Sequence, residues 1–162
     1  MARKSTLNCC QLIVLGILMQ GCAEGYEEIQ QTSAIKVEVV ATDDGYQLLR
    51  GGEPYRIKGA GLEFGDIVSF AAHGGNSIRT WSTDNGVETA MEILDKAQAN
   101  GVTVSLGLPM GAEHWGFDYG DPVAVAAQLE AMRGEVLKYR DHPALLTWIV
   151  GNELNFDYTD SR

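Results

Sequence analysis

The feature that most constrains this chain is a short apolar run that ends in a polar pair, residues 145–153. The run Leu-Leu-Thr-Trp-Ile-Val contains β-branched residues, which predicts a strand buried on both faces, as in parallel sheets. Gly151, Asn152 and Glu153 follow it directly. In α/β barrels the functional side chains stand at the C-terminal ends of the strands. Glu153 is therefore our first candidate for a catalytic residue, with a cap of the following helix or loop as the alternative.

Before this run, short apolar segments alternate with stretches of helical periodicity. Strands are predicted over residues 55–61, 77–81 and 102–108, so the run at 145 would be the fourth. This alternation predicts an α/β fold with a parallel sheet and right-handed crossovers. A closed barrel has eight strands and takes about 250 residues. We therefore expect the first four βα units of a TIM (β/α)₈ barrel; the alternative is a complete small four-stranded domain.

The helices between these strands are predicted from their caps and apolar faces. An Asp before the first turn, or Asp followed by Pro, is a typical helix start. The predicted starts are Asp66 for a helix to about Ala72, Asp84 or Asn85 for a helix that Gly101 terminates, and Asp121-Pro122 for a helix that ends at Asp141. The predicted apolar faces are Val87, Met91, Leu94 and Ala97 in the second helix, and Val125, Leu129, Met132, Val136 and Tyr139 in the third.

Two further segments, a hairpin and a tether, are predicted ahead of the first parallel strand. Residues 35–40 mostly alternate, and residues 46–50 and 55–58 lie on either side of the turn signal Gly-Gly-Glu-Pro at 51–54, which predicts a β-hairpin that can seal the bottom of a barrel. Residues 22–34 are rich in Glu and Gln and predict a flexible tether. Residues 35–162 are then the N-terminal half of the barrel domain.

The N-terminus has the pattern of an export signal, residues 1–21. Arg3 and Lys4 precede an apolar run at 12–19, which is too short to span a bilayer. The sequence Met-Gln-Gly-Cys at 19–22 resembles the lipobox of bacterial lipoproteins, which implies lipidation of Cys22 and an outer-membrane, periplasmic or cell-surface location. The alternative is an ordinary signal peptide that is cut nearby and leaves a free cysteine.

Charge and side-chain chemistry exclude several classes of function. The net charge of −10 argues against nucleic acid or an anionic membrane surface as the main partner and is compatible with a neutral substrate. All cysteines lie in or beside the signal, which excludes a disulfide framework or a cysteine metal site in the body of the protein. The histidines, at 73, 114 and 142, have no metal-ligand spacing, and neither Gly-Gly pair forms a phosphate loop. We expect no metal and no cofactor.

Residues 139–153, with Asp-His-Pro, the strand tryptophan and Gly-Asn-Glu together, resemble the fourth-strand signature of retaining (β/α)₈ glycoside hydrolases, especially the family 2 β-glycosidases. Residues 55–61 and 75–81 are similar to the first and second strands of that family, so the resemblance covers about residues 49–153. It implies that Glu153 is the acid/base, that Asn152 binds the sugar 2-hydroxyl, and that Arg79 pairs with the nucleophile. The nucleophile lies on the seventh strand in such enzymes, beyond Arg162.

The loop at 109–120 follows the third strand and reaches the same end of the sheet as Glu153. Indole rings stack on the apolar faces of sugars, so Trp115 and His114 are candidates for substrate binding. A hydrophobic plug is the alternative for Trp115, and Phe117 and Tyr119 are expected to pack. Trp81 and Glu63, which end the second and first strands, are candidates by position.

The function that these features predict is hydrolysis of O-glycosidic bonds in a β-linked oligo- or polysaccharide by a retaining mechanism. The alternatives are a β-glucan transglycosylase of the same barrel type and a non-catalytic, glycan-binding surface lipoprotein.

Overall fold

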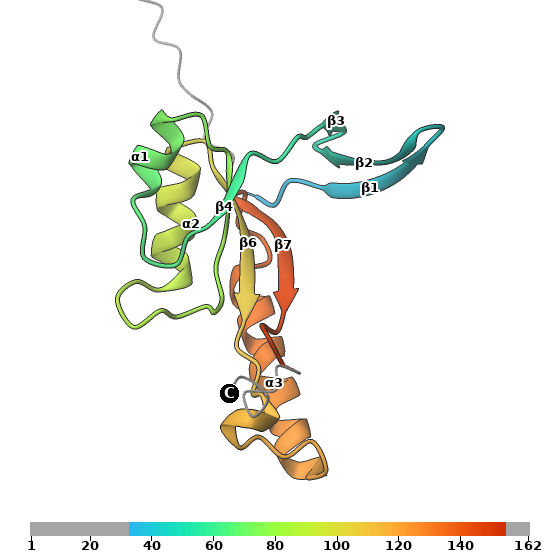
Figure 1. Cartoon of the computed structure of the whole chain (residues 1–162), viewed down its shortest axis with the longest axis vertical. Helices are drawn as coiled ribbons and strands as arrows, with labels where there is room; N and C mark the ends of the chain where they lie inside the picture. Colours follow the sequence, from blue (N-terminus) through green and yellow to red (C-terminus); the bar gives the residue numbers. More distant parts are fainter. Residues whose placement is uncertain (1–32, 155–162) are drawn as a thin grey trace, which may run out of the picture.

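The chain forms an α/β structure with two sheets, described by a computed structural model over residues 33–154. A three-stranded antiparallel sheet precedes a four-stranded parallel sheet of order β4-β5-β6-β7, as predicted (Figure 1). The strands are β1 (Val37–Thr42), β2 (Gly45–Arg50), β3 (Glu53–Pro54), β4 (Gly59–Gly61), β5 (Ser77–Arg79), β6 (Thr103–Leu108) and β7 (Leu145–Val150). The helices are α1 (Ile67–Ala72), α2 (Ala90–Ala99), the 3₁₀ helix η1 (Glu113–Trp115) and α3 (Pro122–Tyr139). The predicted signal at 1–21, Cys22 and most of the tether lie outside the described residues.

The two sheets meet at the N-terminal end of the parallel strands. Arg50 Nη2 donates to the carbonyl oxygen of Pro143, just before β7, at 2.9 Å. Tyr55 Oη donates to the carbonyl oxygen of Asn76, just before β5, at 2.7 Å. The antiparallel sheet, which projects away from the parallel sheet in Figure 1, is thus anchored at the end where the sequence placed the hairpin.

The turns of the antiparallel sheet differ in part from the prediction. The predicted turn at residues 51–52 joins β2 to β3, and the positive φ angles of Gly51 and Gly52, 62° and 86°, suit a tight two-residue hairpin turn. The longer hairpin, β1 with β2, turns one element earlier, between Thr42 and Gly45. Residues 55–58 do not join β4, because the amide of Tyr55 bonds to Leu48 and the amide of Lys58 bonds to the side chain of Asn76. The predicted first strand is therefore only Gly59–Gly61.

The core lies between one face of the parallel sheet and helices α1 and α2. Ile78, Val104 and Leu106 point from the sheet to this face, and Leu94 and Ala97 meet them from α2. The alternate residues of β5, including Arg79, therefore point to the other face of the sheet, because successive side chains of a strand alternate. The core residues of the sheet and Arg79, the candidate site residue on β5, therefore lie on opposite faces of the sheet.

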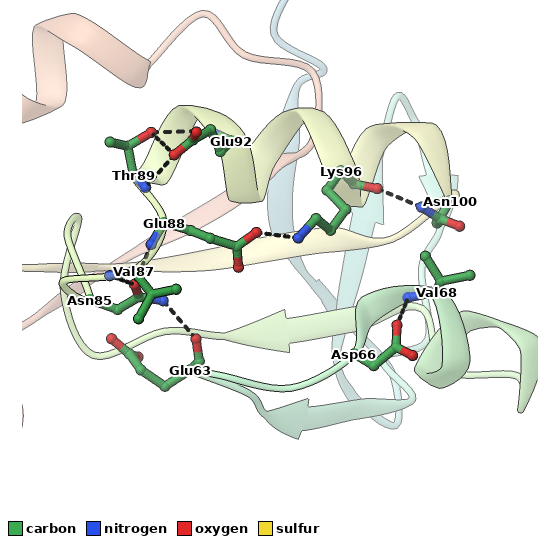
Figure 2. A network of polar contacts seen from close by, with 10 residues as sticks. All are labelled: Glu63, Asp66, Val68, Asn85, Val87, Glu88, Thr89, Glu92, Lys96 and Asn100. Atoms are coloured by element: carbon green, nitrogen blue, oxygen red, sulfur yellow. Dashed lines mark hydrogen bonds and ion pairs between the residues drawn. The ribbon is translucent and has the colours of Figure 1, made fainter.

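The caps of α1 and α3 agree with the prediction, whereas the predicted cap of α2 is wrong. Asp66 and Asp121 accept hydrogen bonds from the first turns of α1 and α3. Helix α2 begins after Thr89, which forms a capping box with Glu92 (Figure 2). Asp84 and Asn85 accept bonds from the amides of the residues just after them and close local turns instead of a helix.

This shift of the helix start changes the face that α2 buries. Val87 lies before the helix and is exposed, and Met91 is partly exposed, while Ile93 and Leu94 are buried. In α3, Tyr139 is buried as predicted, but Leu129 lies on an exposed surface with Leu137. The predicted apolar faces are therefore wrong for Val87, Met91 and Leu129, and right for Leu94, Ala97 and Tyr139.

His142 has a structural role, as its position in the Asp-His-Pro sequence indicated. Its Nδ1 atom accepts a hydrogen bond from the amide of Ala144 at 3.1 Å, so the ring proton resides on Nε2. That nitrogen lies 3.1 Å from a carboxylate oxygen of Asp95 on α2. The imidazole thus links α2 to the start of β7.

None of the helices within residues 33–154 has both the length and the apolar character needed to cross a membrane.

We predict that Gly107→Ala lowers the free energy of unfolding by about 1–3 kcal/mol, because added volume in a close-packed site forces the backbone to shift. A Cβ atom at Gly107 would lie 2.3 Å from the carbonyl carbon of Trp81 and 2.7 Å from the carbonyl oxygen of Thr80. Gly134→Ala in α3 is the matched control, because nothing lies within 4 Å of its added Cβ. The control should raise stability by about 0.5–1 kcal/mol in urea unfolding. Equal changes in the free energy of unfolding for the two substitutions would contradict the close packing of Gly107 against Thr80 and Trp81.

The capping box of α2 predicts a local pH dependence. Hydrogen bonds from the amide and the hydroxyl of Thr89 hold the pKa of Glu92 below its ordinary value of 4.5. A carboxyl group whose pKa is lowered by folding stabilises the folded state above its unfolded pKa, and this stability is lost as the pH falls through the folded pKa. Thr89→Ala should therefore raise the pKa of Glu92 in a carboxyl NMR titration and weaken the loss of stability below pH 4.5. An unchanged titration curve would contradict this.

Candidate functional site

Two candidate residues from different strands meet at the C-terminal end of the parallel sheet. Arg79 ends β5, and Asn152 follows β7, with β6 between them. Arg79 Nη2 donates to Asn152 Oδ1 at 2.8 Å. The guanidinium group therefore reaches across β6, above Ser105 and Gly107, where no bulky side chain of β6 stands in its way.

Arg79 has hydrogen-bonding capacity beyond this contact. Its Nε atom is shielded from solvent and has no hydrogen-bond acceptor among residues 33–154. The guanidinium carbon lies 5.9 Å from the centre of the Trp81 ring. A guanidinium group has five N–H donors, and burying one without an acceptor is costly. The arrangement therefore suits a second acceptor beside Arg79.

Trp81 is held by contacts with β4 and with the segment that follows β4. Its amide donates to Glu63 Oε2 at 2.6 Å, and its ring lies over Gly61, where a Cβ atom would come within 3.1 Å of the indole. Asn85 donates in turn to the backbone carbonyl of Glu63 at 2.8 Å, in the segment drawn in Figure 2. Glu63 thus helps to fix the position of Trp81 by accepting a hydrogen bond from its backbone amide.

Glu153 follows Asn152 in a backbone conformation that is unusual for a side chain of its type. Its φ is 51°, and Gly151, two residues earlier, has a φ of 83°. A left-handed conformation costs a non-glycine residue about 1–2 kcal/mol. Such residues gather at functional sites, where the surrounding structure holds them. Glu153 is exposed and directly follows Asn152, just after the end of β7.

The loop at 109–120 is folded against α3 by polar and aromatic contacts. The amide of Gly111 donates to Gln128 on α3 at 2.6 Å, and its carbonyl oxygen accepts from Tyr119 Oη at 2.7 Å. Phe117 packs on Gly111, and its ring centre lies 4.7 Å from that of Tyr119. Phe117 and Tyr119 therefore pack, as predicted.

Trp115 and His114 have different environments in this loop. Trp115 is 72% exposed, which excludes the hydrophobic plug that was its alternative interpretation. The His114 ring meets the Trp115 ring edge-on, with centres 4.7 Å apart, and both His114 ring nitrogens are shielded from solvent. His114 is thus placed to support Trp115 and not to present a nitrogen at the surface.

A cleft of about 440 Å³ brings several of these residues together. Its volume is in the usual range of small-molecule sites, about 300–1,000 Å³. The residues that matter for its chemistry are Trp81, Ser82, Leu108, Met110, Trp115 and Asn152. Arg79 and Glu63 do not line the cleft, but each is hydrogen-bonded to a residue that does: Arg79 to Asn152, and Glu63 to the amide of Trp81. Ser82 and Met110 were not among the predicted site residues, although each follows directly or closely after a predicted strand.

Comparison of the sequence with protein-family models and with curated proteins found no match. Within residues 33–154, no group of three or more His, Cys, Asp or Glu side chains is placed to hold a metal ion.

We predict that Asn152→Ala destabilises the folded chain by about 1–3 kcal/mol, because it leaves a second donor of Arg79 without its acceptor. Asn152→Asp keeps an oxygen at the same position and should retain most of the stability. Urea unfolding of both variants measures the difference. If Asn152→Ala proves as stable as Asn152→Asp, the hydrogen bond to Arg79 does not hold the two strand ends together.

Proposed function

We propose that this chain forms the first four βα units of a (β/α)₈ barrel in a retaining glycoside hydrolase that acts on a β-linked carbohydrate. The observation that carries the proposal is the 2.8 Å hydrogen bond between Arg79 and Asn152. The sequence resemblance assigns these two residues to one active site, although 73 positions separate them. Their contact at the C-terminal end of a parallel sheet, with Glu153 adjacent, is what such an enzyme requires.

In the proposed reaction Glu153 acts first as an acid and then as a base. Its carboxyl group donates a proton to the glycosidic oxygen while a second carboxylate, on the seventh strand of the barrel, attacks the anomeric carbon. The leaving group departs and a covalent glycosyl-enzyme forms. Glu153, now ionised, takes a proton from water, which attacks the same carbon and releases the sugar with its original configuration. The two carboxyl groups of retaining enzymes stand about 5–5.5 Å apart.

Arg79 and Asn152 have complementary parts in this mechanism. The nucleophile's carboxylate is the second acceptor for which the shielded Nε of Arg79 is suited, and the guanidinium charge keeps that carboxylate ionised. Because Asn152 Oδ1 accepts from Arg79, its amide nitrogen is left to donate to the substrate. A bond from this nitrogen to the sugar 2-hydroxyl that strengthens in the transition state would increase the rate.

The same proposal includes export. Residues 1–21 act as a lipoprotein-type signal, Cys22 carries the lipid, and residues 22–34 tether the barrel to the outer membrane or cell surface. Export brings the enzyme to oligo- or polysaccharides outside the cell. The tether is followed directly by the antiparallel sheet, which in the proposed barrel would close the bottom, at the N-terminal end of the parallel strands.

We predict that the protein, expressed at the full length of its native reading frame, hydrolyses aryl β-glycosides. Glu153→Gln should lower kcat by about 10²-fold or more for substrates with poor leaving groups, since general acid–base catalysis contributes about 10²–10⁴-fold. Sodium azide should restore turnover of an activated aryl glycoside in this variant by forming a β-glycosyl azide, because azide needs no general base.

Full activity in the Glu153→Gln variant, or azide products of inverted configuration, would overturn the proposal. Products longer than the substrate would instead support the transglycosylase alternative. Binding without any turnover in the unmodified protein would support the glycan-binding alternative.

A further inference from the structure

We propose that the cleft between Trp81 and Trp115 binds an uncharged pyranose segment of the substrate and rejects acidic sugars such as uronates and sulfated sugars. The inference rests on the proposed function for its general ligand, a saccharide. It adds the position of a sugar-binding subsite and the charge class of the sugar. Three features of the described residues carry it: the cleft's walls, the support of its outer indole ring and the charge of the surrounding loops.

The walls of the cleft match the chemistry of a neutral sugar. Two indole side chains and the apolar side chains of Leu108 and Met110 line it, and none of its lining residues is charged. A pyranose has apolar C–H faces that stack on aromatic rings, and a rim of hydroxyl groups that need donors and acceptors. Ser82 and Asn152 supply polar groups at the same cleft. An acidic sugar would lose hydration there without gaining a counter-charge.

The outer ring, Trp115, is exposed but well supported. Its amide donates to the carbonyl oxygen of Ala112 at 3.0 Å, and Ala112 is fully buried. Gly116, in the left-handed region with a φ of 90°, ends the 3₁₀ turn, and His114 packs against the indole edge. A large exposed aromatic ring held by such contacts loses little conformational freedom on binding, which favours its use as a stacking surface.

The loops around the cleft carry charge of one sign. Four segments follow the ends of the parallel strands, at residues 62–66, 80–89, 109–121 and 151–154. These segments contain no Lys or Arg. Their acidic residues are Glu63, Asp66, Asp84, Glu88, Glu113, Asp118, Asp121 and Glu153. Arg79 lies on a strand, with its guanidinium directed to Asn152. Within these four loops an anionic sugar therefore meets repulsion without a basic partner. Arg133 on α3, which shares a different pocket with Leu108, forms an ion pair with Glu130 at 3.8 Å.

The test is direct binding to the native-length Glu153→Gln protein, so that turnover is not part of the readout. Isothermal titration at about 150 mM salt compares neutral β-linked tetrasaccharides of glucose, mannose, galactose and xylose with tetrauronates of matched length. We expect at least one neutral tetrasaccharide to bind about tenfold or more tightly than any uronate. Trp115→Ala should weaken that binding about tenfold, and Trp115→Phe should weaken it less.

Tyr46→Ala is the control, because Tyr46 is an exposed aromatic residue on β2, outside the cleft, with an exposed fraction of 83% against 72% for Trp115. It should leave binding unchanged. Equal or tighter binding of a uronate, or a Trp115→Ala variant that binds like Tyr46→Ala, would overturn the inference. Binding of neutral sugars by a protein without hydrolytic activity would remove the proposed hydrolysis and keep the cleft assignment. Hydrolysis of neutral substrates that is unaffected by Trp115→Ala would remove the cleft assignment and keep the proposed hydrolysis.

Discussion

The hydrogen bond from Arg79 to Asn152 depends on the register of three parallel strands. Arg79 pairs with Ser105 on β6, while β6 pairs with β7 past an irregularity between Val104 and Ser105. That register brings the end of β7 within reach of a side chain two strands away. The close approach of Gly107 to the backbone of Trp81 keeps the strand ends together where a side chain would separate them. The candidate site is therefore a product of the sheet and not of the loops alone.

The parts of the molecule that lack neighbours are consistent with the same architecture. Every residue of β4, at one edge of the parallel sheet, is exposed, and so are Thr147 and Val150 on β7 at the other edge. Leu129 and Leu137 lie on the face of α3 that borders an apolar pocket near the end of β6. Open strand edges and apolar helix faces are the surfaces that further βα units cover in a closed barrel. The proposed barrel would cover them without changing the four strands already formed.

The sequence predicted those features that depend on local chemistry with one dominant signal. Asp66 and the Asp121-Pro122 pair are each a clear helix start, and the apolar run at 145 is short, rich in β-branched residues and ended by Gly151. The start of α2 was mispredicted because Asp84, Asn85 and Thr89 are all good caps, and Asn85 and Thr89 each have Glu three residues later. Gly86, in the left-handed region with a φ of 79°, directly follows the two earlier candidates. The exposure of Trp115 and the contact between Arg79 and Asn152 could not be read from spacing, because both depend on how distant segments pack. The resemblance assigned Arg79 to the nucleophile and Asn152 to the sugar, both in one active site; the contact between the two side chains is a finding of the structure, and the sheet register brings it about.

The distribution of charge along the strands gives the net charge of −10 a more specific meaning. Basic residues occur at the N-terminal end of the parallel sheet, as Arg56, Lys58 and Arg140, whereas the loop residues at the C-terminal end that the structure describes, 62–66, 80–89, 109–121 and 151–154, include acidic residues and no Lys or Arg. Acidic residues also lie at the N-terminal end, as Asp141 beside Arg140 and Asp95 beside His142, so the two ends differ in their basic residues and not in their acidic ones. In the proposed enzyme, acidic loops would keep anionic polymers away from the cleft, while Arg79, which donates to Asn152, would have further donors for a carboxylate from the rest of the barrel. In the proposed enzyme, the half-buried cation of Arg79 and the acidic loops around it would meet two separate demands: to hold an ionised protein carboxylate and to admit a neutral substrate.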